Sequence, residues 1–320
     1  WLLSCDWHFV RPLRPTARFF SEPLFVGEGS HVAVAVAVAA AVAVAVAAAA
    51  AVAVAVAVAV PVAVAAAAAA AVAAACVTLR TVPLTSSFPR LSYQTFGSQG
   101  APVLFVMGFG MPGAVWGPQV EDLQRDHRCC HYDHLGVGES DRGPFLRTIP
   151  AMADDALRLM DELSWDRAHI VGVSMGGMIA QELALRAQDR LRSLTLVATH
   201  GGAPVASLPT PKGLWLFIRG LFGGKKTRMK TLPRLLYPDA FIESMGSELL
   251  DHLDVRLGTP PKLRTVLGQL YAVNRHSTES RLHQIETPTL LVRPGLDILI
   301  RPTQTDRLAE RIPNAEVLRF

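Results

Sequence analysis

Cysteine is scarce in this chain of 320 residues, with only Cys5, Cys76, Cys129 and Cys130. Small secreted domains that depend on disulfides carry many more cysteines for their length. Four thiols in a chain this long, two of them adjacent, form no such framework. The sequence therefore excludes a disulfide-rich scaffold and favours a reducing compartment.

The chain also has no large excess of positive or negative residues. Lys and Arg total 31 and Asp and Glu total 27, which leaves a formal net charge of +4. Nucleic-acid-binding proteins cluster basic residues with aromatic ones, and no segment here shows that pattern. We therefore expect no nucleic-acid partner.

Polar residues are absent from one long segment. Residues Val32–Ala75 are all Ala or Val except Pro61, and they account for most of the positive mean hydropathy of +0.29. Without them about 42% of the residues are hydrophobic and about 21% are charged, which are ordinary values for a globular domain. We divide the chain into a leader (1–31), this tract (32–76) and a folded region (80–320).

The tract allows three interpretations. It is a low-complexity repeat without a selected fold, a membrane helix, or part of a targeting segment with the arginines of the leader. The 29 uncharged residues of 32–60 exceed the ~20 needed to span a bilayer, so membrane contact through this stretch is one of the alternatives. We expect leader and tract to take no part in chemistry.

Short apolar strands alternate with helices after residue 80. This alternation predicts an α/β fold, with a mostly parallel sheet and helices on both faces. Helices are predicted over Pro118–Arg125, from Met152 to Leu163 and from Ile179 to Ala187. The predicted strands are Arg90–Phe96, Ala101–Met107, Cys129–Tyr132, His169–Val173, Leu194–Ala198, Thr289–Val292 and Glu316–Phe320.

The segment 201–286 interrupts this rhythm, because it is helical in composition and has no strand pattern. Its aromatic residues predict either an apolar lining for a site or a packing core of its own. The basic run Gly224–Lys230 suits an anionic headgroup or membrane surface, or a solvated loop. The pair Gly223-Gly224 at its start favours the loop.

One motif points to chemistry. Gly172-Val173-Ser174-Met175-Gly176-Gly177 matches G-x-S-x-G between a predicted strand and a predicted helix. A sharp strand-to-helix turn crowds its neighbours, and glycine avoids a clash of Cβ there. The turn would project the hydroxyl of Ser174 above the sheet as a nucleophile, near the positive end of the helix.

Here the chain resembles the α/β-hydrolase fold family over about residues 85–320. The resemblance implies a helical cap over 201–286 and an oxyanion hole from the backbone N–H groups of Met175 and Phe109. The family's usual His-Gly pair is replaced by Met107-Gly108, but only main-chain donors are needed. Asp297 follows a strand in a G-x-x-D segment and matches the family's acid, which orients a histidine.

A histidine after the acid is lacking. In the family the base lies beyond the last strand, and here the sequence stops at Phe320. His134, His200, His276 and His283 all precede Asp297 and match the pattern poorly. Together with the start at Trp1, this predicts a fragment shortened at both ends, with the base after Phe320 and little activity. Robust ester turnover would point instead to His134 or His200.

We predict that Ser174 attacks an ester-type bond of a small, lipophilic acyl substrate. The reaction would pass through an acyl-enzyme. The serine disfavours family members with Asp at this turn, such as dehalogenases and epoxide hydrolases. An acyltransferase or lyase on the same residues, or a non-catalytic receptor-like member, are the alternatives. Nothing in the sequence predicts a cofactor or a metal ion.

Overall fold

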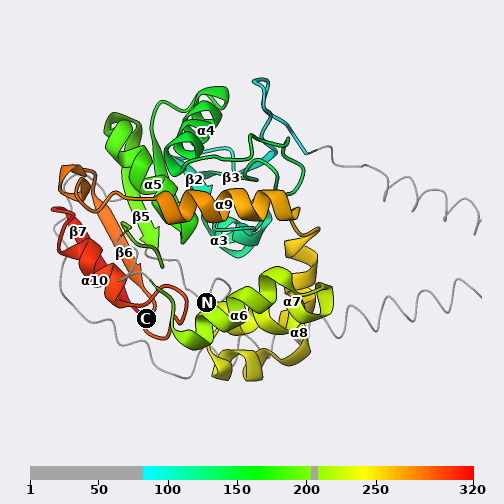
Figure 1. The fold of residues 1–320 in the computed structure, drawn as a ribbon. Helices are drawn as coiled ribbons and strands as arrows, with labels where there is room; N and C mark the ends of the chain where they lie inside the picture. Colours follow the sequence, from blue (N-terminus) through cyan, green and yellow to red (C-terminus); the bar gives the residue numbers. More distant parts are fainter. Residues whose placement is uncertain (1–81, 203–207) are drawn as a thin grey trace, which may run out of the picture. The chain divides into compact units, whose positions relative to one another are not determined.

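The computed structural model describes residues 82–202 and 208–320, so the leader and the Ala/Val tract lie outside the described residues. Seven strands form one sheet in the order β1-β3-β2-β4-β5-β6-β7 (Figure 1). β1 is antiparallel to β3, and the other neighbours are parallel. The strands are β1 (Tyr93–Phe96), β2 (Pro102–Val106), β3 (Arg128–Tyr132), β4 (Ala168–Val173), β5 (Leu191–Val197), β6 (Thr289–Arg293) and β7 (Ala315–Arg319).

Helices cover both faces of the sheet, as expected for parallel strands that are buried on two sides. Along β2, Leu104 and Val106 join one core cluster, whereas Val103 and Phe105 join the other. The first cluster includes the inner faces of α4 (Ile149–Glu162) and α5 (Met175–Arg186), and the second that of α3 (Gly117–Leu123). The predicted α/β fold with a mostly parallel sheet is confirmed.

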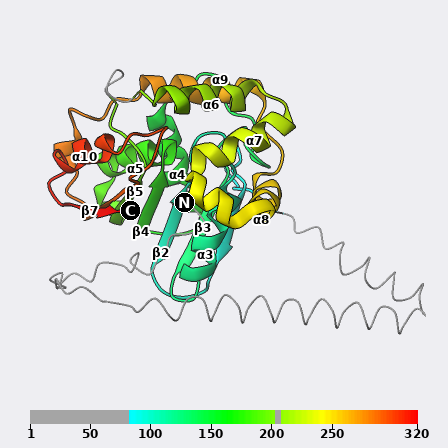
Figure 2. The ribbon, with the colours of Figure 1, turned by 90° about the horizontal axis from the view of Figure 1, so that it is seen from below.

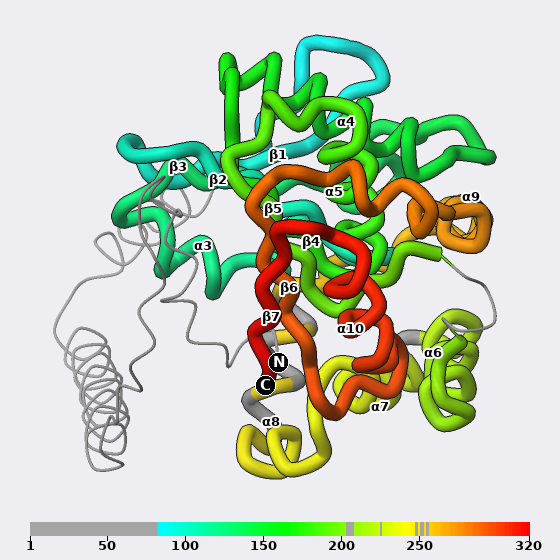
Figure 3. The backbone as a smooth tube through the Cα atoms, turned by 90° about the vertical axis from the view of Figure 1, so that its left-hand side faces the viewer, coloured from blue at the N-terminus to red at the C-terminus, as the bar shows by residue number. Residues whose placement is uncertain are grey.

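The C-terminal strands follow the same parallel pattern. The helix α10 (Thr303–Ala309) connects β6 to β7, which lies at the edge of the sheet beside β6 (Figure 3). Short 3-10 helices occur at Gly113–Trp116, Gln188–Arg190 and Leu282–Gln284. Among the helices of the described residues, none combines the length and hydropathy needed to cross a membrane.

Four helices fill the segment between β5 and β6. They are α6 (Pro211–Phe222), α7 (Lys225–Leu236), α8 (Asp239–Leu257) and α9 (Leu263–Arg275), and Figure 2 shows α6 next to α7. The prediction of a solvated loop over Gly224–Lys230 is wrong, because these residues form the N-terminal cap and first turns of α7. Lys, Arg and Met are good helix formers, and Gly224 stands at the cap position, where glycine is tolerated.

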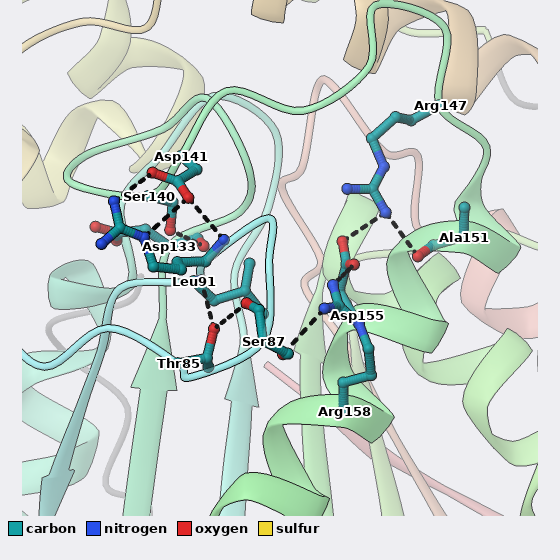
Figure 4. Close-up of polar contacts among 11 residues, drawn as sticks. Thr85, Ser87, Leu91, Asp133, Ser140, Asp141, Arg147, Ala151, Asp155 and Arg158 are labelled. Atoms are coloured by element: carbon teal, nitrogen blue, oxygen red, sulfur yellow. Dashed lines mark hydrogen bonds and ion pairs between the residues drawn. The ribbon is translucent and has the colours of Figure 1, made fainter.

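A buried carboxylate on α4 organises a polar network at one side of the sheet (Figure 4). Asp155 pairs with Arg147 and with Arg158, at 2.6 Å each, and its side chain is 8% exposed. Arg158 also donates to the hydroxyl of Ser87, in the segment that precedes β1. The network therefore ties this segment to α4 and to the loop after β3.

We expect Asp155→Asn to lower the free energy of unfolding by about 2–4 kcal/mol, because it leaves two guanidinium groups without their buried counter-charge. Urea unfolding followed by circular dichroism measures the change. Asp154→Asn is the matched control on the same helix. Its ion pair with Arg186 is about half exposed, so its loss should cost less than about 1 kcal/mol. Equal losses in both variants would contradict this role for Asp155.

Candidate active site

Ser174 stands at the turn between β4 and α5 in an unusual backbone conformation, with φ 54° and ψ −118°. A non-glycine residue in such a region costs of order 1–3 kcal/mol, so neighbours must hold it there. The N–H of Ser174 donates to the carbonyl of Val197 at 2.9 Å. Its own carbonyl accepts from the hydroxyl of Thr199 at 2.7 Å. The end of β5 thus holds the turn on both sides of the serine.

The glycines around Ser174 permit close contact between backbones. A Cβ on Gly176 would lie 2.1 Å from the carbonyl oxygen of Val106, at the end of β2. A Cβ on Gly172 would lie 2.4 Å from the carbonyl oxygen of Gly176. These distances exclude any side chain, so the expected reason for the glycines in this motif agrees with the structure.

The loop after β2 lies against the same turn. A Cβ on Gly108 would be 3.4 Å from the Cβ of Ser174. Phe109 follows, half-buried, with its ring 5.6 Å from that of Phe217 on α6. Met175 is fully buried as the first residue of α5. The structure therefore places the predicted oxyanion loop next to the predicted nucleophile.

Asp297 lies in the loop after β6, beyond the same end of the sheet. Its Oδ1 accepts from the N–H groups of Leu299 and Ile300, at 2.7 and 2.8 Å. Burial raises the pKa of Asp297 to about 6, against the opposing effect of these two hydrogen bonds. Burial thus makes the ionised form of Asp297 costly, and a cation beside the carboxylate would stabilise that form.

Comparison with known proteins identifies the family. Residues 101–227 match the α/β hydrolase fold family. The protein "Putative carbamate hydrolase RutD" of Azorhizobium caulinodans is 32% identical over 230 residues, which cover 71% of this chain and 84% of that protein. The protein of the same name from Pseudomonas savastanoi is 31% identical, over 68% of this chain and 84% of the relative. The chain belongs to the α/β-hydrolase fold family.

Solved structures share this fold. The enol-lactonase of Burkholderia xenovorans superposes with a TM-score of 0.65 at 23% identity, covering 74% of this chain and 91% of that one. A thermophilic esterase of Thermogutta terrifontis superposes with a TM-score of 0.61 at 24% identity, covering 74% and 87%. The resemblance that the sequence predicted is confirmed at the level of the α/β-hydrolase fold.

The histidines that precede Asp297 have other partners or lie elsewhere. Nε2 of His134 donates to the carbonyl of Met107 at 2.8 Å, and Nδ1 of His200 accepts from Gly202 at 3.1 Å. The ring of His276 lies 6.3 Å from that of His200, and His283 is exposed. Within residues 82–202 and 208–320, no hydrogen bond joins a histidine to Ser174 or Asp297.

Two contacts at the site could not be predicted from the sequence. Thr199 bonds the carbonyl of Ser174, and the buried Gln269 on α9 accepts from the N–H of Gly110 at 2.8 Å. Gln269 and Gly110 are 159 positions apart, so no local pattern could relate them. Gln269 also lines a cleft of about 300 Å³ between α9 and the loop after β3, whose lining does not include Ser174.

Gly176→Ala should destabilise the protein by more than about 2 kcal/mol, because its methyl group would overlap the backbone of β2. Thermal and urea unfolding test this. Gly224→Ala is the control, since nothing lies within 4 Å of a Cβ there, and the change of cap residue should cost at most about 1 kcal/mol. A stable Gly176→Ala variant would mean that the turn does not approach β2 this closely.

Stability should also depend on pH through buried neutral histidines. Burial lowers the pKa of His131, His169 and His200 to about 4 and that of His276 to about 3. The unfolded chain then binds more protons between about pH 6.5 and 4, so stability is full above this window and is lost as pH falls through it. The raised pKa of Asp297 acts in the opposite direction.

We expect the free energy of unfolding to fall by at least about 2 kcal/mol from pH 6.5 to 4. His200→Asn should make this slope shallower, whereas replacement of the exposed His283 by Asn should leave it unchanged. Urea unfolding at several pH values measures the slope. Identical slopes in all three proteins would show that His200 does not contribute.

Proposed function

We propose that this α/β hydrolase cleaves an ester-type bond by nucleophilic attack of Ser174. The observation that carries the proposal is the turn itself: a serine with positive φ, between β4 and α5, held by backbone contacts from β2 and β5. Backbone strain of this kind clusters at functional sites. The geometry suits a nucleophile, because Ser174 precedes the first residue of α5 and its hydroxyl would lie near the positive end of that helix.

We assign the stabilisation of negative charge to two backbone N–H groups, those of Met175 and Phe109. Met175 begins α5, so its N–H is among those that no helical carbonyl accepts. Phe109 belongs to the loop whose Gly108 lies against Ser174. Removal of one such donor typically costs on the order of 10²–10³ in rate, so this pair would supply a large share of catalysis.

We propose that the base is a histidine in residues that follow Phe320. The N–H of Phe320 donates to Arg293, and its carbonyl accepts from Gly295 at 2.8 Å. Gly295, which bonds Phe320, lies only two positions before Asp297, so any residues that follow Phe320 would begin close to the Asp297 loop. A histidine in that continuation would meet the carboxylate of Asp297, which would orient the ring and stabilise its charged form.

The reaction would then proceed as acyl transfer to water. The histidine takes the proton of Ser174, and the oxygen attacks the carbonyl carbon to give a tetrahedral oxyanion. Collapse expels the leaving group, which receives that proton, and leaves an acyl-enzyme. Water, activated by the same base, attacks the acyl carbon and releases the acid and Ser174.

The relatives and the helices α6–α9 support our proposal for the substrate class. The names of the relatives include a carbamate hydrolase, an enol-lactonase and an esterase, which share an acyl carbon bonded to oxygen or nitrogen. We assign the helices α6–α9 as a cap. Phe217 of α6 packs on Phe109, which supports an apolar wall and a small, lipophilic acyl group.

A fluorophosphonate probe tests Ser174 directly. In the 320-residue chain we expect slow labelling, because no described histidine is bonded to the serine, and an increase of about tenfold or more when free imidazole supplies a base. Ser174→Ala should abolish labelling. Ser277→Ala, which removes an exposed serine outside the turn, should label like the parent.

Labelling that persists in Ser174→Ala would refute the assignment of the nucleophile. Fast labelling without imidazole that is lost in His134→Ala or His200→Ala would place the base within the chain and refute its assignment to the residues after Phe320. Mass spectrometry of the labelled peptide identifies the modified residue in each case.

A further inference from the structure

Helix α6 exposes one apolar face. Leu214, Trp215, Ile218 and Phe222 recur at helical spacing, and all four are exposed, Trp215 by 56% and Phe222 by 68%. Large apolar side chains so exposed are costly in water when they gather on one surface. Two aromatic and two aliphatic side chains on one face together indicate a surface that binds an apolar partner.

The opposite face of α6 is already used by the fold. Leu216 is 3% exposed, and Phe217 packs on Phe109. The N-terminal end of α6 is held by Thr210, whose N–H and hydroxyl both donate to the carbonyl of Ile298 at 2.9 Å. A Cβ on Gly213 would lie 2.2 Å from that same oxygen. The exposed face is therefore turned away from the site by these contacts and cannot be buried by a simple rotation.

Helix α7, packed beside α6, supplies positive charge (Figures 1 and 2). Lys226, Lys230 and Arg234 follow at steps of four residues, so they share one face, and all three are exposed. Residues 208–238 contain seven Lys and Arg and no Asp or Glu. Lys212 pairs with Asp239 at the start of α8, at 3.5 Å, and no acid within the hairpin balances its other cations.

We propose that the α6–α7 hairpin is a docking surface for an anionic lipid bilayer. An amphipathic helix with Trp, Phe and Leu on one face and adjacent cations is suited to lie in the plane of the headgroups. Tryptophan is favoured at this depth, and each lysine or arginine near an anionic surface contributes about 1 kcal/mol. The guanidinium of Arg219 lies 4.7 Å from the ring of Trp215, which keeps a cation at the edge of the apolar face.

Charge complementarity favours a bilayer over a second copy of the chain. Two copies that met through this face would bring the exposed cations of both hairpins together, among them Lys226, Lys230 and Arg234 of each copy, and this opposes association. The anionic headgroups of a bilayer remove this repulsion and also accept the apolar side chains. Because the inner face of α6 touches Phe109 and the Asp297 loop, docking would hold the candidate site close to the bilayer. The inference itself does not depend on Ser174.

Sedimentation with vesicles tests the surface in the full chain. We expect binding to phosphatidylcholine vesicles that contain about one-third phosphatidylglycerol, and at least about tenfold weaker binding to phosphatidylcholine alone or at high salt. The triple variant Lys226→Glu, Lys230→Glu, Arg234→Glu should lose about tenfold or more in affinity. The double variant Trp215→Ser, Phe222→Ser should lose binding as well, because it removes apolar area.

Matched variants control for charge and for exposed apolar residues. The charge control is a triple variant that replaces exposed cations elsewhere in the chain: Arg125→Glu, Arg192→Glu, Arg275→Glu. It changes the net charge by the same amount as the surface variant. The apolar control, Phe88→Ser, removes a strongly exposed aromatic residue outside the hairpin. Both should bind like the parent. The Ala/Val tract is present in every protein compared, so any affinity of its own cancels.

A second readout locates the contact. Brominated lipids should quench the fluorescence of Trp215. The signal of this residue is obtained when the emission spectrum of the Trp215→Phe protein is subtracted from that of the parent. Unquenched Trp215, or equal binding by surface and control variants, would overturn the proposal. A dimer in solution that only the surface variants dissociate would also overturn it, since a second copy would then occupy the face.

Discussion

The rest of the site depends on the contact between the turn at Ser174 and the end of β2. Gly176 approaches the carbonyl of Val106 so closely that no side chain is accommodated. This approach sets the position of α5 against the sheet, and with it the position of Met175. The same contact brings the loop of Gly108 and Phe109 beside Ser174. The strained conformation of one serine is thus maintained by tight packing of backbone against backbone.

The helices between β5 and β6 add two connections to this centre. Phe217 of α6 rests on Phe109, and Gln269 of α9 accepts from Gly110. The loop that we assign to the oxyanion hole is therefore supported from both ends of the helical segment. A displacement of these helices would change the environment of that loop, which couples the outer surface of α6 to the candidate site through direct contacts.

Burial determines the electrostatics of the titratable groups. The histidines inside the sheet region are held neutral, because their pKa values are lowered by removal from water. The same cause raises the pKa of Asp297. A carboxylate that is costly to ionise alone favours a cationic partner, which agrees with the role that we assign to it beside a histidine.

The sequence by itself determined the fold class and the position of Ser174, because alternation of apolar strands with helices and a glycine-flanked serine are local patterns. The prediction of a loop over Gly224–Lys230 is wrong: Gly223 and Gly224 suggest a loop, whereas the helix formers that follow them determine the structure. Only the tertiary structure decided that Thr199 and Gln269 support the site, that His134 and His200 have other partners, and that α6 leaves Trp215 and Phe222 exposed. These outcomes depend on contacts between residues far apart in the chain, and a local pattern carries no information about which distant groups will meet.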